Sequence, residues 1–139
     1  IDPQSGAVAV VGYWAVDDVG TIVDETIVDG QLHGGVAQGL GQVLGEHVVY
    51  GADGQLVNAS FMDYVMPRAG TMPAIATAHH SVPCTSNPLG VKGAGESGVA
   101  GALPAGMGAV LDALAQRGIT QFDLPASPER VWRALAAAC

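Results

Sequence analysis

The sequence predicts an α+β fold that joins strands to a glycine-rich helix and ends in two further helices. Three observations predict it. Residues 6–18 are rich in Val, Tyr and Trp and are bounded by glycines, as is typical of a strand. Apolar residues recur at helical spacing over residues 31–46. Near the C-terminus, Gly118 ends one helical pattern, and Ser127 followed by Pro128 begins another.

The glycine-rich helix, residues 31–46, is expected to begin after a break at Asp29-Gly30. Its apolar side chains share one face: Leu32, Val36, Leu40, Val43 and Leu44. The segment also contains five glycines: Gly34, Gly35, Gly39, Gly41 and Gly45. Each interior glycine costs about 1 kcal/mol relative to alanine, so the helix needs compensating contacts. Glycines permit the close approach of another backbone or of a ligand, and the sequence leaves both readings open.

The middle of the chain is predicted to form a hairpin, a strand and an irregular loop. Two short apolar runs, 48–50 and 55–57, flank the turn sequence at 51–54, which indicates the hairpin. Residues 74–82 are expected to form a further strand. Residues 83–101 contain two prolines and several glycines and are therefore predicted to be irregular.

The C-terminal part is predicted to form two helices joined by a connector or short strand at 119–124. Pro104 suits the first turn of the first helix. The apolar residues of that helix recur at helical spacing: Met107, Val110, Leu111 and Leu114. In the last helix, Ser127 is expected to act as the N-cap, with Pro128 as its first residue. Its inward side chains are expected to be Val131, Trp132 and Leu135.

The composition suggests a segment that packs against other protein. Only 13% of the 139 residues are charged, which is few for the surface of a free domain, although an ordinary small domain with few surface charges is the alternative. The strand at 6–18 starts without a lead-in, so we expect residues 1–139 to be one segment of a longer protein. The net charge of −8 argues against nucleic acid and anionic membranes as partners. No apolar run approaches the roughly 20 residues of a membrane span, and no secretory leader opens the chain. The isolated cysteines Cys84 and Cys139 suggest reduced thiols and a cytoplasmic location.

The loop Asn87–Gly98 contains the candidate chemistry. Residues 93–98 formally fit the dinucleotide pattern G-x-G-x-x-G, but no hydrophobic strand directly precedes them. A phosphate-binding P-loop is excluded because no Gly-Lys-Ser/Thr ends the loop. Two readings of Glu96 remain: a solvated carboxylate in a structural turn, or a positioned base beside a cofactor. A carboxylate in an apolar, partly dry pocket acquires a raised pKa and can act as a base near neutrality.

Several segments carry a family resemblance. They are Ala15–Gly20, Gly30–Gln42, Phe61–Pro67, Gly90–Glu96 followed by Ala102–Ala105, and Leu124–Trp132. In this order and spacing, they closely resemble the C-terminal part of molybdenum hydroxylase large subunits. This is the family of xanthine dehydrogenase, aldehyde oxidase and aerobic carbon monoxide dehydrogenase. The resemblance implies that residues 1–139 form a C-terminal segment of a molybdopterin-binding domain, incomplete on its own.

The resemblance also implies a site. Glu96 matches the family's catalytic base, which deprotonates the oxygen nucleophile supplied by the molybdenum centre. Gln38 matches a glutamine near the metal, and its amide can donate and accept hydrogen bonds. Gly93 and Gly95 match backbone positions close to the cofactor, and Lys92 is a further candidate cofactor contact. No metal ligand from this chain is expected.

The implied cofactor is a molybdenum–pterin group, in its cytosine dinucleotide form, shared with the remainder of the large subunit. The implied partners are iron–sulfur and flavin (FAD) subunits, and the substrate is an aldehyde, an aromatic heterocycle or carbon monoxide. Two alternatives stay open: a non-catalytic assembly module of the same fold without bound cofactor, and an unrelated glycine-rich enzyme domain.

Other polar residues are given structural interpretations. His79 and His80 are neighbours on a predicted strand and so point to opposite faces. His33 and His47 are too far apart for a local metal site. Asp17-Asp18 is expected to build a turn at the end of a strand. The chain departs from many relatives at Asp24-Glu25, where they carry Asn-Pro, which leaves the turn geometry there open.

Overall fold

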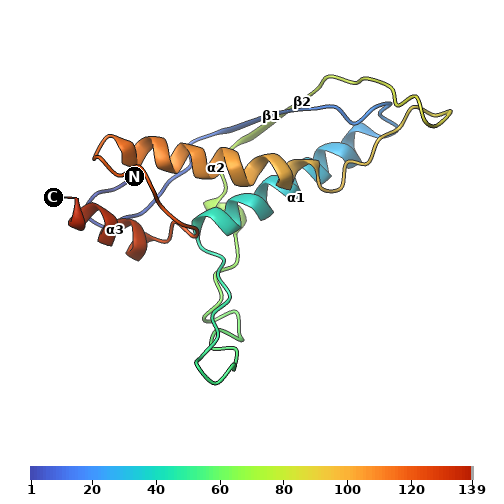
Figure 1. Cartoon of the computed structure of the whole chain (residues 1–139). Coiled ribbons are helices and arrows are strands. Elements are labelled where there is room, and N and C mark those ends of the chain that lie inside the picture. Colours follow the sequence, from blue (N-terminus) through green and yellow to red (C-terminus); the bar gives the residue numbers. More distant parts are fainter. Residues whose placement is uncertain (139) are drawn as a thin grey trace.

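The computed structural model describes residues 1–138 and has the predicted α+β class. Cys139 lies outside the described residues. The elements are β1 (Tyr13–Asp17), α1 (Glu25–Leu44), a short 3-10 helix (Ala69–Thr71), β2 (Ile75–His79), α2 (Ser97–Ala115) and α3 (Pro128–Ala137). In Figure 1, α1 and α2 lie side by side and the two strands pass along them, while the segment after α1 extends away as an arm. Both termini lie at the end of the molecule that holds α3.

The two strands form a parallel pair that is shorter than predicted. β1 and β2 pair from Tyr13–Ile75 to Asp17–His79, so only five residues of each predicted strand form the ladder. Exposure alternates along both strands, as expected for a sheet with one covered face. On the other face, Trp14 is 78% exposed and Val16 is 71% exposed. Parallel sheets in proteins are usually covered on both faces, so this apolar face supports the expectation that the segment packs against other protein.

Helices α1 and α2 approach each other through glycines. A Cβ at Gly98 would lie 2.6 Å from the carbonyl oxygen of Leu32 and 3.2 Å from the Cα of Gly35. One turn further along, a Cβ at Gly39 would lie 2.5 Å from the Cβ of Ala102. These contacts also show that the two helices run in the same direction. The close approach of another backbone, one of the two readings of the glycine pattern, is confirmed for this face of α1.

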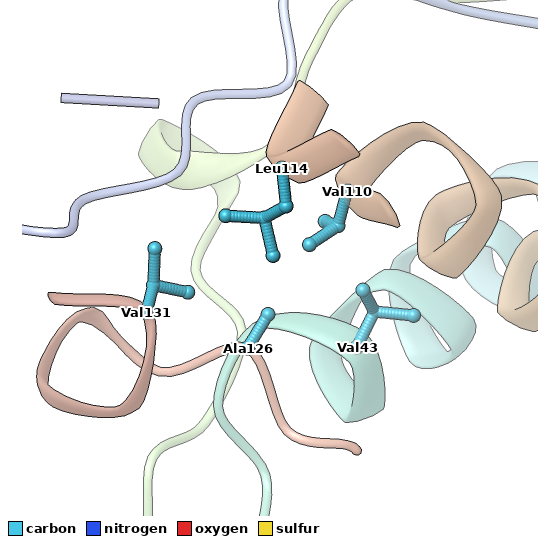
Figure 2. Packing of buried hydrophobic residues seen from close by; sticks show 5 residues of the cluster. All are labelled: Val43, Val110, Leu114, Ala126 and Val131. Atoms are coloured by element: carbon cyan, nitrogen blue, oxygen red, sulfur yellow. The ribbon is translucent and has the colours of Figure 1, made fainter. Parts of the chain in front are cut away.

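The core lies along the seam between the helices. The predicted apolar face of α1 is confirmed, because Leu32, Val36, Leu40 and Val43 are fully buried. Figure 2 shows Val43 of α1, Val110 and Leu114 of α2, and Val131 of α3 gathered around Ala126. The prediction that Trp132 points inward is wrong, since its side chain is 47% exposed. The other two predicted inward side chains are confirmed, since Val131 is fully buried and Leu135 packs against the core.

Both long helices begin earlier than predicted. Asp24 caps α1 by accepting a hydrogen bond from the backbone N–H of Ile27 (3.1 Å), so Asp29-Gly30 lies inside the helix and does not break it. The departure at Asp24-Glu25 thus corresponds to a helix start. Helix α2 begins at Ser97, which places Pro104 in its interior. Close packing against α1 stabilises this first part of α2 despite the proline, which lacks a backbone N–H.

The remaining predicted elements are confirmed in part. The hairpin is present in the arm, but it reduces to a single bridge between Tyr50 and Leu56, with flanking backbone hydrogen bonds. The segment 119–124 is a connector without strand structure. Gly118 has φ +77° and follows the end of α2, as a C-terminal stop should. Ser127 is the N-cap of α3 by position, but its side chain makes no capping hydrogen bond.

Helix α2 corrects one expectation from composition. With 19 residues, it is long and apolar enough to cross a membrane by length and composition. The buried residues of α2 lie on the face that packs against the rest of the chain: Gly98, Ala102, Gly106, Val110 and Leu114. Within residues 1–138, only that face, which packs against α1 and α3, is covered, and 28% of the apolar window is buried.

Candidate functional site

The loop before α2 is held rigidly by its own asparagine and by the turn after β1. The Asn87 side chain donates to the carbonyl of Val91 (3.0 Å) and accepts from the Val91 N–H (3.2 Å). Gly90 has φ +68°, and its carbonyl accepts hydrogen bonds from the backbone N–H groups of Thr21 and Cys84, both at 2.9 Å. A left-handed conformation favours glycine here. The loop therefore reaches α2 along a fixed path.

The Asp18 side chain also holds this loop, through two hydrogen bonds and an ion pair. Its carboxylate accepts from the backbone N–H groups of Gly20 and Val82, both at 3.0 Å, and pairs with Lys92 Nζ at 2.5 Å. The hydrogen bond from Lys92, followed by the two backbone hydrogen bonds, holds the pKa of Asp18 far below its usual value. The expected turn-building role is confirmed for Asp18. The Lys92 ammonium group forms its ion pair with Asp18.

The segment after Lys92 is open. A Cβ at Gly93 would meet nothing within 4 Å, and a Cβ at Gly95 would meet only Gln31 Oε1, at 4.0 Å. Glu96 is the N-cap residue of α2, but its side chain makes no capping hydrogen bond and is exposed. The neighbouring Ser97 donates its hydroxyl to the carbonyl of Ala94 (3.0 Å). The N-terminal end of α2 therefore has open backbone at Gly93 and Gly95 next to a Glu96 carboxylate that makes no capping hydrogen bond.

Gln31 is a site neighbour that the sequence interpretation missed. It lies on α1 opposite Gly95, and Gly95 directly precedes Glu96 in the chain. The predicted neighbour, Gln38, is exposed on α1 two turns further along. Since Gly35 lies against Gly98 and Gly39 against Ala102, Gln38 is level with residue 101, about 7–8 Å beyond Glu96 at 1.5 Å per residue. The structure therefore brings Gln31, ahead of Gln38, to the level of the carboxylate.

The histidines do not form a local metal site. Of the pair on and after β2, His79 faces α1 and contacts Asp29, whereas His80 is exposed. His33 is exposed on α1, and His47 lies beyond the end of that helix. Over residues 1–138, no group of three or more His, Cys, Asp and Glu side chains is placed to hold a metal ion.

Comparison with known proteins identifies the family. A sequence model of the molybdopterin cofactor-binding domain matches residues 1–73, which is more than half of the chain. The chain belongs to this family. It is a fragment of a molybdenum hydroxylase large subunit, as the resemblance predicted.

Relatives extend the match beyond residue 73 and through the Glu96 loop. The carbon monoxide dehydrogenase large chain of Hydrogenophaga pseudoflava is 37% identical over 97% of this chain and 17% of its own length. The nicotine 6-hydroxylase large subunit of Paenarthrobacter nicotinovorans is 42% identical over 96% of this chain and 16% of its own length. The chain thus spans about a sixth of the length of these curated relatives.

Solved structures give the same result for the fold. Quinoline 2-oxidoreductase from Pseudomonas putida 86 superposes with a TM-score of 0.93 at 40% identity, over 98% of this chain and 17% of that one. A Cu,Mo-carbon monoxide dehydrogenase superposes with a TM-score of 0.91 at 33% identity, over 99% of this chain and 17% of that one. The relatives are molybdenum hydroxylases and dehydrogenases, so this chain belongs to an oxidoreductase family.

The open end of α2 is compatible with a bound cofactor. At Gly93 and Gly95, no side chain of this chain occupies the space into which a Cβ would project, so a large group can approach the backbone there. Gln31 offers an amide at the same level. Both Glu96 and Gln31 are exposed on this chain, so the remaining walls of a dry pocket have to come from other protein.

Proposed function

We propose that this chain supplies the catalytic base Glu96 and part of the molybdopterin pocket of a molybdenum hydroxylase large subunit. The observation that carries the proposal is the uncommitted Glu96 carboxylate at the N-terminus of α2, beside the open backbone of Gly93 and Gly95. The chain acts together with the remainder of the large subunit, which encloses the cofactor.

Each residue of the proposed site has a distinct part. A bound molybdenum–pterin group would supply an electrophilic metal and accept the electrons of the oxidation. Glu96 accepts the proton that is released as the oxygen nucleophile forms. Gly93 and Gly95 let the cofactor approach the backbone, and Lys92 holds their loop through Asp18. The Gln31 amide can donate to and accept from groups of the cofactor beside Glu96, and Gln38 is a candidate contact further along α1.

The finer assignments rest on the resemblance and on the names of the relatives. The substrate is carbon monoxide, an aldehyde or an aromatic heterocycle, and the cofactor is the cytosine dinucleotide form of molybdopterin. Electrons would leave through iron–sulfur clusters and FAD on partner subunits. The assembly is expected in the cytoplasm.

The test replaces Glu96 in the assembled enzyme. Glu96→Gln keeps the shape of the side chain and removes its basicity, so turnover should fall by about 100-fold or more. The molybdenum and pterin contents of the variant should match those of the parent, because the amide occupies the same space. Glu129→Gln is the matched control, since Glu129 lies on α3 in an exposed ion pair with Arg133 and should leave turnover unchanged.

Two outcomes would overturn parts of the proposal. Full turnover in Glu96→Gln with cofactor bound would show that another group is the base. A native assembly that contains no molybdenum or pterin would instead support the non-catalytic assembly module.

A further inference from the structure

A polar cluster outside the proposed site ties the start of α1 to β2. Asp29 Oδ1 accepts a hydrogen bond from Thr77 Oγ1 at 2.8 Å and lies 3.1 Å from His79 Nε2. Thr77 and His79 alternate with exposed residues on β2, so both belong to the face that covers α1. Further back on the same face, Ile75 packs against the apolar core. The contact between β2 and α1 is therefore apolar at Ile75 and consists of hydrogen bonds nearer the N-terminus of α1.

The cluster contains a buried polar atom without a partner. The His79 side chain is only 10% exposed, and over the residues that the structure describes its Nδ1 atom has no hydrogen-bond partner. A buried unsatisfied polar group costs about 1–3 kcal/mol, so an apolar residue could pack here more favourably. Directional hydrogen bonds also fix the position of one element relative to another, which apolar packing does less specifically. The cluster is better explained by the position that it imposes on α1.

The position of α1 matters because Asp29 lies close to the proposed site along the helix. Gln31 is two residues beyond Asp29 and stands opposite Gly95, beside Glu96. Between these points and the core, α1 meets α2 through Gly35 and Gly98, where backbones touch and no side chains interlock. A smooth contact of this kind resists sliding and rotation poorly. Directional hydrogen bonds at Asp29 supply the missing restraint.

We propose that Asp29, held by Thr77 and His79, is a positioning residue that keeps Gln31 and the N-terminus of α2 in register around Glu96. This inference rests on the proposed function of Glu96. Asp29 acts through α1 and does not touch the reacting groups.

The other charged groups around the cluster have different roles. Asp29, Thr77 and His79 line a shallow hollow that Glu25 also lines from the first turn of α1, and His33 lies one turn beyond Asp29. Asp17 is the register partner of His79 in the parallel strand pair, and its side chain lies on the same face of the sheet. Each can add charge near His79, but the hydrogen bonds that join β2 to α1 come from Thr77 and His79 to Asp29.

The experiment compares three variants in the assembled enzyme. Asp29→Ala removes the acceptor, and Thr77→Val removes one donor while keeping the β-branched shape. Asp29→Asn keeps an acceptor oxygen and should restore function. Asp112→Ala on α2 is the control, because Asp112 is exposed and lies toward the other end of that helix.

The expected results separate positioning from simple stability. With turnover expressed per bound molybdenum, Asp29→Ala should lower kcat about 10-fold or more, Thr77→Val less, and both should change KM by no more than about threefold. Asp29→Asn should recover to within about threefold of the parent, because its amide oxygen still accepts from Thr77. Hydrogen–deuterium exchange should be faster in residues 25–31 and 93–98 of the Asp29→Ala variant than in the control.

The outcomes are distinguishable from a failure of the proposed function. If Asp29→Ala and Thr77→Val lower the thermal stability but leave kcat per molybdenum and the exchange of residues 93–98 unchanged, the positioning role is refuted. If Asp29→Ala does not assemble, Thr77→Val decides by the same two measurements. The Glu96→Gln variant, assayed in parallel, tests the base independently of either result.

Discussion

The contact between α1 and α2 allows a prediction in which two substitutions of the same kind have opposite signs. Both glycines belong to α2, Gly98 in its first turn and Gly108 in its interior. Replacing either glycine with alanine should favour the helix intrinsically by about 0.5–1 kcal/mol. At Gly108 the new Cβ would meet nothing within 4 Å, so Gly108→Ala should stabilise the chain by about that amount.

At Gly98 the same methyl group has no room. Its Cβ would lie 2.6 Å from the Leu32 carbonyl oxygen, 3.1 Å from the Val36 nitrogen and 3.2 Å from the Gly35 Cα. These are backbone atoms, so only a movement of one helix relative to the other can relieve the overlap. Overpacking that displaces backbone costs about 1–3 kcal/mol or more, which exceeds the gain in helix propensity. Gly98→Ala should therefore destabilise the chain.

Thermal unfolding followed by circular dichroism measures both effects. Each kcal/mol should move Tm by about 4 °C in a chain of this size, so the two variants should fall on opposite sides of the parent. Because Gly98 is two residues from Glu96, Gly98→Ala should also lower the cofactor content of the assembled enzyme. A Gly98→Ala chain as stable as Gly108→Ala would refute the close backbone contact between the helices.

Three further predictions concern the supports of the site. Asp24→Ala removes the N-cap of α1 and should lower the stability by about 1 kcal/mol, measured as a lower denaturation midpoint. Asp24→Asn should largely retain the cap. Equal midpoints for the parent and both variants would contradict the capping role. Hydrogen bonds in the folded state depress the pKa values of Asp18, chiefly through Lys92, and of Asp29, chiefly through Thr77. The stability that these ionised carboxylates contribute is therefore fully present above their unfolded pKa of about 4 and is lost as the pH falls below it. Urea midpoints should decline below about pH 4, and they should decline less steeply in Asp18→Asn. Asn87→Ala removes both side-chain bonds to Val91 and should speed proteolytic cleavage in residues 83–96, while the exposed neighbour variant Thr85→Ala should leave cleavage unchanged.

The sequence predicted those parts of the fold that depend on periodicity. The buried face of α1 and the buried positions Val110 and Leu114 of α2 follow from apolar spacing alone. The starts of these helices did not follow, because Gly30 and Pro104 are helix breakers by propensity. A local N-cap and a tertiary contact override that propensity: Asp24 caps α1 before Gly30, and α1 packs against α2 before Pro104.

The candidate site was predicted less completely for a related reason. Gln31 and Gln38 are seven residues apart on one helix, so they share nearly the same face, and no pattern in the sequence ranks them. Only the register of α1 against α2 does so. The contacts of Gly35 with Gly98 and of Gly39 with Ala102 show that register, in which Gln31 lies beside Gly95. The partner of Lys92 is likewise a long-range contact, since Asp18 is 74 residues away in the chain.

The glycines of α1 and α2 therefore connect the fold with the proposed chemistry. On the shared face, Gly35 and Gly98 bring the helices close enough for α1 to flank the start of α2. At the end of that face, Gly93 and Gly95 leave the backbone open, and Glu96 extends beside them without a capping bond. A larger residue at Gly98 would separate the helices, and Gln31 would move away from Gly95 as they part. The same substitution should thus affect both stability and the site, whereas Gly108→Ala should affect stability alone. Close helix packing is in this way a condition for placing the proposed base, and the loss of turnover per bound molybdenum in Gly98→Ala, compared with Gly108→Ala, measures that condition.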